Sequence, residues 1–152
     1  MTGMYGSFDR VGPRVVAPGE FPLWDAALAL LNGDLLATLP GQEPLRLVAL
    51  PSFGGDEDGA EYVHVAMSDG TWHGNALPPD SAADRARAVD AVADAAQETV
   101  SERLWQAWPL CTAHGLGLHP REVAGRLSWW CAGPREDADG HLRAAVGELD
   151  GR

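Results

Sequence analysis

Residues 81–107 form the longest amphipathic segment of the chain, and they constrain the fold more than any other part of the sequence. Apolar residues recur there at spacings of three and four, which is the period of one helical face. Ser81 and Asp84 match a capping box at the start, and Pro109 predicts an end before it. We therefore predict a helix about 40 Å long with an alanine-rich stripe that a neighbouring element can approach closely. The stripe comprises Ala82, Ala86, Val89, Ala93, Ala96, Val100 and Leu104.

The first part of the chain predicts a loose segment followed by a second helix. Residues 1–20 are rich in Gly and Pro and show no period, which is typical of a flexible N-terminal arm. Pro22 suits a first helical turn, and Asn32-Gly33 suits a helix C-terminus. An apolar stripe between these signals supports a helix. The stripe consists of Trp24, Ala27, Leu28 and Leu31.

Two segments between these helices favour β-structure. Residues 44–50 alternate in the way expected of a strand, and "DLLATL" before them is either its hairpin partner or an extra helical turn. Asp69-Gly70 separates two strand-like runs in "EYVHVAMSDGTWHGN", which predicts a second hairpin. Its inward face would carry Val63, Val65, Met67 and Trp72. Its outward face would carry Tyr62, His64, Ala66 and His73.

These patterns together predict an α+β fold with one or two antiparallel β-hairpins packed on two helices and a small zinc-ribbon-like C-terminal tail. We expect a flexible arm at 1–20, an α+β core at 21–107 and a tail rich in Cys, His and Trp at 108–152. "RLSWWC" and "HLRAAVGEL" are the predicted strands of this tail. The adjacent Trp129 and Trp130 would point to opposite faces of the first of them.

The tail contains the residues best suited to bind a metal. Cys111 and His114 have the C-x2-H spacing that lets two side chains of one tight turn point at the same ion. Cys131 ends a predicted strand, where a second turn can begin. Tetrahedral zinc needs four ligands, and His141 and His119 compete for the fourth position. We predict Cys111, His114, Cys131 and His141 as the ligands, with His119 as the alternative.

The stretch "WPLCTAHGLGLHP…GRLSWWC…GHLRAAVGEL" resembles the tails of short uncharacterised actinobacterial proteins. Their pattern is a W-P-x-C-P-x-H knuckle, then W-x-C, then a closing strand, and they look like degenerate zinc ribbons. The resemblance covers residues 105–149. It implies Cys111 and His114 as the knuckle, Cys131 as the second-strand ligand and His141 as the fourth ligand. It implies no activity, and the sequence departs from the pattern at Thr112, where the group has Pro.

Three other interpretations of these cysteines and histidines are open from the sequence. The cysteines can be small buried hydrophobic residues beside surface histidines, or they can form a disulfide. Cys111 can also be a catalytic thiol with His114 as its base, although a preceding helix C-terminus disfavours a thiolate. Two further candidates are weaker, because such polar groups are usually only solvated. They are a His64/His73 pair and a calcium-attracting loop with Asp56, Glu57 and Asp58.

The charge balance limits the partners. The chain has 22 acidic residues and 11 basic residues, all of them Arg, for a net charge of −11. An acidic surface repels phosphate backbones and anionic lipid, so we expect no direct contact with nucleic acid or a membrane and favour a basic protein partner. No apolar run resembles a secretory signal or a membrane span, which favours a cytoplasmic protein.

The sequence thus favours a small, acidic, non-enzymatic interaction protein with a structural zinc site. The first alternative is a metal- or thiol-dependent enzyme in which Cys111, His114 and Cys131 leave a fourth position open. The deaminase and H-E-x-x-H arrangements are absent. The second alternative is an acidic inhibitor of the immunity-protein or nucleic-acid-mimic type, with acidic loops in place of phosphates.

Overall fold

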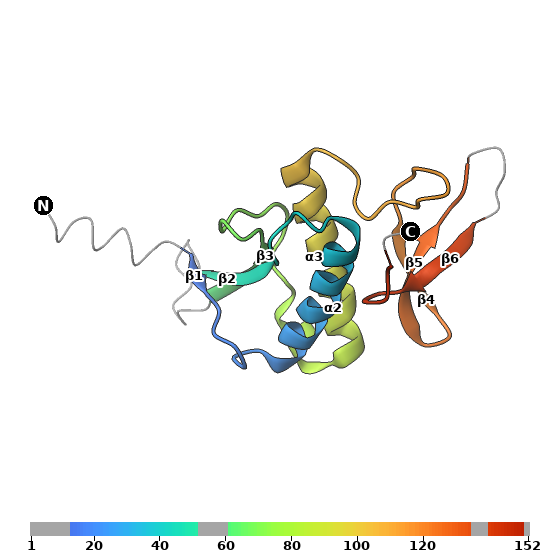
Figure 1. Ribbon diagram of the computed structural model, residues 1–152. Helices are drawn as coiled ribbons and strands as arrows, with labels where there is room; N and C mark the ends of the chain where they lie inside the picture. The colour runs from blue at the N-terminus through green and yellow to red at the C-terminus, as the bar shows by residue number, and fades with distance from the viewer. Residues whose placement is uncertain (1–12, 52–60, 135–139, 151–152) are drawn as a thin grey trace, which may run out of the picture.

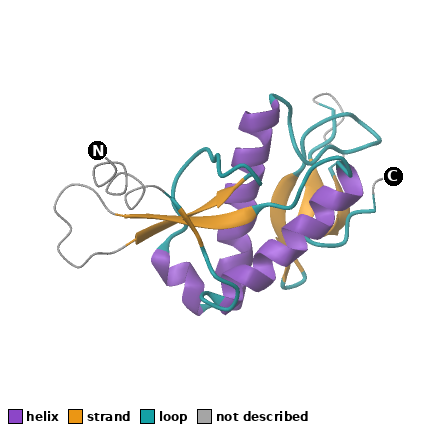
Figure 2. Cartoon of the chain, turned by 60° about the vertical axis from the view of Figure 1, so that its left-hand side comes forward, coloured by secondary structure: helices purple, strands orange, loops and turns teal. Residues whose placement is uncertain are grey.

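The computed structural model describes residues 13–51, 61–134 and 140–150. Within them the protein is α+β, as predicted, with two α-helices and two three-stranded antiparallel sheets. Figure 1 shows helices α2 (Pro22–Thr38) and α3 (Arg85–Leu104) side by side between the two sheets. Figure 2 shows the same order of sheet, helices and sheet from a second direction. The helices therefore form a central layer that is covered on both sides.

The N-terminal sheet has the order β1-β2-β3, with β1 at Arg14–Val15, β2 at Arg46–Pro51 and β3 at Glu61–Ala66. Leu47 pairs with Val65 and Ala49 with Val63, and all four are buried. Because side chains alternate along a strand, this register gives the sheet one apolar face against the helices. Residues 13–20 belonged to the predicted flexible arm. They instead contribute β1 and the buried Val16.

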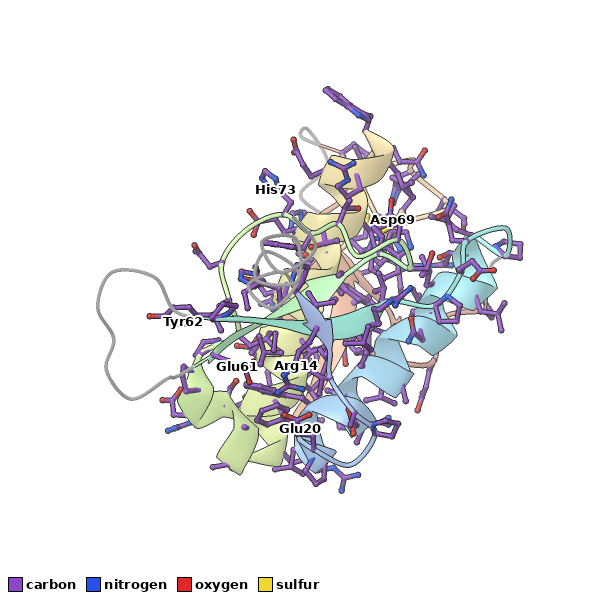
Figure 3. All side chains as sticks on the ribbon, turned by 90° about the vertical axis from the view of Figure 1, so that its left-hand side faces the viewer. Arg14, Glu20, Glu61, Tyr62, Asp69 and His73 are labelled. Carbon is purple, nitrogen blue, oxygen red and sulfur yellow. The ribbon has the colours of Figure 1, made fainter. Side chains whose placement is uncertain are left out.

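Ion pairs hold β1 against its surroundings. The Arg14 guanidinium contacts Glu20 at 2.6 Å and Glu61 on β3 at 2.7 Å (Figure 3). Arg14 holds the pKa of both carboxyl groups below their ordinary range. All three side chains are solvated, so these pairs fix the position of β1 more than they stabilise the fold.

The sequence predicted that helix α2 ends at Asn32-Gly33, but the helix continues to Thr38. The segment "DLLATL" is therefore the extra helical turn and not a hairpin strand. The Asn32 side chain forms two hydrogen bonds with the backbone of Leu45, at 3.1 Å and 2.7 Å. The asparagine thus ties the helix to the start of β2 and does not cap it.

Helix α3 is shorter at both ends than predicted. Its cap is Asp84, which accepts a hydrogen bond from the Arg87 amide at 2.9 Å. Ser81 is not a cap, since it lies buried in the 3-10 helix η1 (Pro79–Ala83) and accepts a hydrogen bond from Trp24 Nε1 at 3.0 Å. The helix ends at Leu104, because Trp105 takes the left-handed conformation with φ 57°.

The buried face of α3 is also rotated from the predicted stripe. Ala93, Ala96 and Val100 are buried as expected, whereas Ala86 is exposed. Because α3 contacts α2, both sheets and η1, it buries more than one stripe. Its buried residues are Ala88, Val92, Ala93, Ala95, Ala96, Thr99 and Val100.

The predicted second hairpin forms its turn but not its second strand. The Met67 amide bonds to the Thr71 carbonyl at 2.8 Å, with Gly70 at φ 90°. Beyond it, Thr99 of α3 accepts a hydrogen bond from the His73 amide at 3.1 Å, and its hydroxyl lies 3.0 Å from the Val65 carbonyl. Thr99 thus bonds to backbone groups that a second hairpin strand would use. The strand that pairs with β3 is β2.

Two residues of this segment consequently face the opposite way from the prediction. Trp72 is half-buried, and its ring lies against His64 with centroids 4.9 Å apart, so it is not part of the core. Ala66, predicted on the outward face, is fully buried. Val63, Val65 and Met67 are in the core as predicted.

The C-terminal sheet has the order β4-β5-β6, with β4 at His119–Val123, β5 at Arg126–Cys131 and β6 at His141–Ala145. Strands β5 and β6 were predicted, but β4 was missed. It is an edge strand in which only Pro120 and Val123 are partly buried, and the other three residues are polar and exposed. Neither an alternating pattern nor β-propensity therefore marks it in the sequence. The predicted last strand also ends early, since the chain turns at Gly147.

A buried carboxylate on α2 fixes this sheet to the helices. Asp34 is fully buried and accepts hydrogen bonds from Trp129 Nε1 at 2.7 Å, the Gly147 amide at 2.7 Å and the Leu149 amide at 2.9 Å. Burial raises the pKa of Asp34 above its ordinary value, although its three donors act in the other direction. Trp108 forms a similar link between the tail and α2, because its Nε1 donates to Thr38 at 2.9 Å.

None of the helices in the described ranges has the length and apolar character needed to cross a membrane.

We predict a graded loss of stability at Asp34. Asp34→Ala leaves three donors without their acceptor and should cost about 3 kcal/mol or more, since each lost partner costs about 1 kcal/mol or more. Asp34→Asn keeps one acceptor oxygen and should cost about 1–2 kcal/mol. Urea unfolding of the three proteins measures both values. Equal stability of Asp34→Ala and the wild type would contradict this role.

The raised pKa of Asp34 also predicts how its contribution changes with pH. The folded state binds a proton more tightly than the unfolded state, so the contribution is fully present below the ordinary pKa of 3.8. It is lost as the pH rises through the higher folded pKa. The stability difference between the wild type and Asp34→Asn should therefore shrink as the pH increases from 3.8. Chemical unfolding of both proteins across this range measures the difference, and an increase with pH would contradict the assignment.

Candidate metal centre

The structure brings together the four residues of the tail that the sequence favoured. One donor atom from each of Cys111, His114, Cys131 and His141 lies within 4.8 Å of every other. The alternative ligand His119 does not join them. It is exposed at the start of β4, where it pairs with Trp130.

A tight turn after α3 positions the first two residues. The Cys111 amide bonds to the Leu116 carbonyl at 2.7 Å, and the Gly115 amide bonds back to the Cys111 carbonyl at 2.7 Å. Gly115 has φ 68°, a conformation that favours glycine, which explains why glycine directly follows His114. The turn places the Cys111 and His114 side chains on the same side, as the C-x2-H spacing predicted.

Strand pairing positions the other two residues. Cys131 is the last residue of β5, His141 is the first of β6, and the two lie directly opposite each other in the antiparallel register. Opposite residues of such a pair point to the same face of the sheet. The ten-residue separation in sequence is therefore closed by backbone hydrogen bonding, although residues 135–139 of the connection lie outside the described part.

The distances match a tetrahedral metal site. Cys111 Sγ lies 3.6 Å from His114 Nδ1 and 3.5 Å from His141 Nε2, and Cys131 Sγ lies 3.3 Å from His114 Nδ1. Bond lengths of about 2.3 Å to sulfur and about 2.0 Å to nitrogen place adjacent donors of a tetrahedron about 3.5 Å apart. The four side chains can therefore hold one ion with little rearrangement.

The surroundings of the two sulfur atoms differ. Both cysteines are fully buried and reduced. At Cys111 burial opposes ionisation, but the nearby amides of His114 and Ala113 and the Cys131 side chain favour it, and the net pKa lies below the ordinary value. At Cys131 burial dominates and raises the pKa, although the Gly133 amide lies 3.4 Å from its sulfur. Amides close to the sulfur atoms suit thiolates, which are the metal-binding form of cysteine.

Two buried tryptophans lie close in sequence to the two cysteines and connect them to the core. Trp108 precedes Cys111 by three residues, and Trp129 lies two residues before Cys131 on the same face of β5. The two indole rings meet edge to face, with centroids 6.1 Å apart, and both are anchored to α2 through Thr38 and Asp34. Each cysteine is thus attached to the core through an adjacent aromatic side chain.

The outer face of β5 carries Trp130, which points away from Trp129 as predicted. The Arg121 guanidinium of β4 lies 4.4 Å from the centre of the Trp130 ring system, a cation–π geometry. Gly140 lies so close to this indole that a Cβ atom there would collide with the ring. No sequence pattern marked Arg121, whereas the glycine directly before His141 was a usable signal for a tight contact.

The other candidate sites from the sequence do not form clusters in the described residues. His64 lies against Trp72 and burial lowers its pKa, whereas the His73 ring lies 3.9 Å from the Glu98 carboxylate. Asp56, Glu57 and Asp58 lie outside the described residues. The Cys/His group is the one metal-type cluster within the part of the chain that the structure describes.

No protein-family model, no curated protein and no solved structure matches the chain. What this centre can do therefore follows from the geometry and chemistry of its four side chains.

The contact between Gly140 and Trp130 yields a prediction. Gly140→Ala forces a methyl group into the indole and should destabilise the protein by about 1–3 kcal/mol, the usual cost of overpacking. Gly41→Ala is the matched control, since a Cβ at Gly41 meets nothing within 4 Å, and it should change stability by less than about 0.5 kcal/mol. Thermal unfolding of both variants measures the difference. Equal effects would contradict the tight contact.

Proposed function

We propose that this protein is a small, non-enzymatic interaction protein whose C-terminal module is built around a structural zinc ion. Cys111, His114, Cys131 and His141 are the proposed ligands. The supporting observation is the closed group of four donor atoms, all within 4.8 Å of one another, on two fully buried sulfurs and two imidazoles. A tetrahedral set of two sulfur and two nitrogen donors is the chemistry that zinc prefers.

The closed donor set favours a structural role over catalysis. Catalytic zinc keeps one position open for water or substrate, whereas four protein ligands fill the tetrahedron. Two surface hollows run along α3, and none of the four residues lines either of them. This arrangement supports the interaction protein over the metal- or thiol-dependent enzyme.

A metal also has a physical purpose in this module. Only part of the apolar surface of the tail is buried: Trp108 and Trp129 are buried and bond to α2, whereas Leu110, Leu116 and Leu142 are exposed. Sheet β4-β5-β6 and the Cys111 turn are thus covered on one side only. A bound ion joins the turn to the β5–β6 pair and replaces the missing apolar contacts. Because both cysteines are free and free thiols persist in reducing compartments, we propose a cytoplasmic location.

Metal content tests the proposal directly. Protein purified without a histidine tag should contain about one zinc per chain, and Cys111→Ser should lose it because serine binds zinc poorly. The loss should lower the melting temperature by about 10 °C, the shift that about 3 kcal/mol produces in a chain of this size. Elemental analysis and calorimetry measure both. Absence of metal from the wild type would overturn the zinc proposal, and loss of zinc without loss of stability would overturn its structural role.

The two competing histidines provide a matched control. His141→Ala should reduce zinc affinity at least about tenfold, because it removes a ligand, whereas His119→Ala should leave affinity unchanged. Cobalt substitution gives an independent readout, since a tetrahedral ion with two thiolates shows strong visible bands and sulfur-to-metal charge transfer. Equal effects of the two variants would contradict the assignment of His141.

A further inference from the structure

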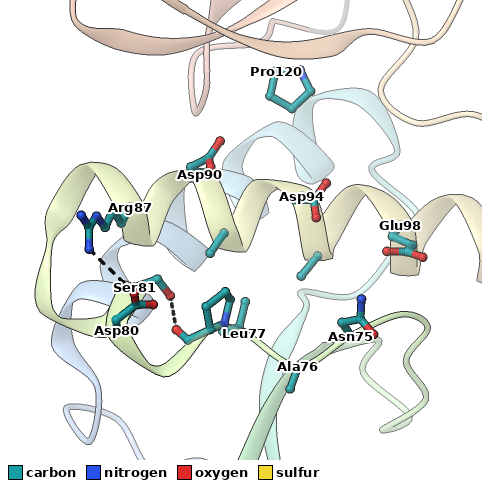
Figure 4. A pocket seen from close by; sticks show the side chains of 13 residues that line it. Asn75, Ala76, Leu77, Asp80, Ser81, Arg87, Asp90, Asp94, Glu98 and Pro120 are labelled. Atoms are coloured by element: carbon teal, nitrogen blue, oxygen red, sulfur yellow. Dashed lines mark hydrogen bonds and ion pairs between the residues drawn. The ribbon is translucent and has the colours of Figure 1, made fainter.

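Two adjoining hollows form one groove along the exposed side of α3. Their volumes are about 570 Å³ and about 430 Å³, and they share Asp94 and Glu98. Figure 4 shows α3 between the two borders of the larger hollow, with Leu77, Asp80 and Ser81 on one side of the helix and Pro120 of β4 on the other, the side on which Asp90 and Asp94 lie. The smaller hollow continues toward the end of the helix, beside His73 and His119.

A row of four carboxylates lines this groove. Asp90, Asp94, Glu98 and Glu102 follow one another at intervals of four residues, so they lie on one helical face about 18 Å long, and all four are exposed. Like charges at this spacing destabilise a helix. Within the described residues few basic side chains offset this repulsion. His73 lies 3.9 Å from Glu98, whereas Arg87 pairs with Asp80, which is not part of the row. The row therefore costs stability that the fold itself does not require.

Trp105 is a second and independent feature at the end of this row. It follows the helical turn that carries Glu102, and 89% of its surface is exposed. Its backbone has φ 57°, a conformation that is unfavourable for a bulky side chain, where glycine would be the usual residue. A tryptophan with this exposure buries little apolar surface within the described part of the chain. Exposed aromatic residues of this kind are typical anchors of protein–protein contacts.

We propose that the α3 groove and Trp105 together form the docking surface for an arginine- or lysine-rich segment of a partner protein that also carries an apolar residue. The carboxylate row attracts the basic side chains, and Trp105 packs against the apolar one. The inference rests on the proposed function as an interaction protein and supplies the chemistry of the partner. Nucleic acid is disfavoured because phosphates are repelled by the same row. A metal ion is disfavoured because these carboxylates do not converge into a metal-type cluster.

A short fluorescein-labelled peptide of alternating arginine and leucine is the probe, and fluorescence polarisation is the measurement. Wild-type protein should bind it, and binding should weaken with added salt because screening reduces the attraction. Asp94→Asn combined with Glu98→Gln removes the two carboxylates shared by both hollows. This double variant should raise the Kd roughly tenfold while leaving stability unchanged or slightly higher, because like-charge repulsion is relieved.

The control variant changes net charge equally outside the groove. Glu43 and Glu148 are exposed and line neither hollow, so Glu43→Gln combined with Glu148→Gln should change the Kd by less than about twofold. Equal weakening by the two double variants would show that only net charge attracts the peptide and would overturn the docking surface. Absence of binding to the wild type at low salt would overturn it as well.

Trp105→Gly tests whether Trp105 contributes to peptide binding or only to the stability of the fold. Glycine relieves the left-handed backbone, so the variant should be at least as stable as the wild type, yet its Kd for the same peptide should rise roughly fivefold. Loss of stability, or unchanged binding, would overturn the anchoring role. Elemental analysis of the same samples keeps the two proposals apart. Zinc with no peptide binding overturns the docking surface alone, and peptide binding without zinc overturns the zinc site alone.

Discussion

The Asp34 carboxylate accepts hydrogen bonds from a tryptophan of β5 and from two amides of the C-terminal turn, all within a site that water does not reach. A buried carboxylate loses its hydration, and such a group is retained only where its donors are correctly placed. The three donors come from residues 129, 147 and 149, far from Asp34 in sequence. Their common acceptor therefore fixes how β4-β5-β6 lies on the helices, and the rest of the tail depends on this placement.

The candidate metal centre follows from that placement. Trp129 and Cys131 share one face of β5, so the docking of the indole on Asp34 also sets the position of the second cysteine. Trp108 does the same for Cys111 through its hydrogen bond to Thr38. The tail is thus attached to α2 at two indole anchors, and the four donor atoms close the end away from the helices. A metal bound in this position would join two segments that the core already holds close together.

Helix α3 has two faces with different purposes. Its buried face is rich in alanine, which lets α2 and both sheets approach closely and makes the helix the centre of the molecule. Its exposed face concentrates carboxylates in a groove that the loop after β3 and the edge strand β4 border. Because the same helix supports the tail and lines the groove, a zinc ion that stabilises the tail would also preserve the groove wall formed by β4.

The sequence by itself determined the class of the fold, both helices, most strands and the grouping of Cys111, His114 and Cys131 with one further histidine. These depend on local periodicity and on short spacings, such as C-x2-H within one turn, which hold in any tertiary setting. Tertiary structure alone decided which histidine completes the centre, because the choice of His141 over His119 follows from the pairing of β5 with β6. It also decided that Asn32 bonds to Leu45 and that Thr99 replaces a strand partner. In each case a polar group was satisfied by a partner distant in sequence, and no local pattern encodes such a contact.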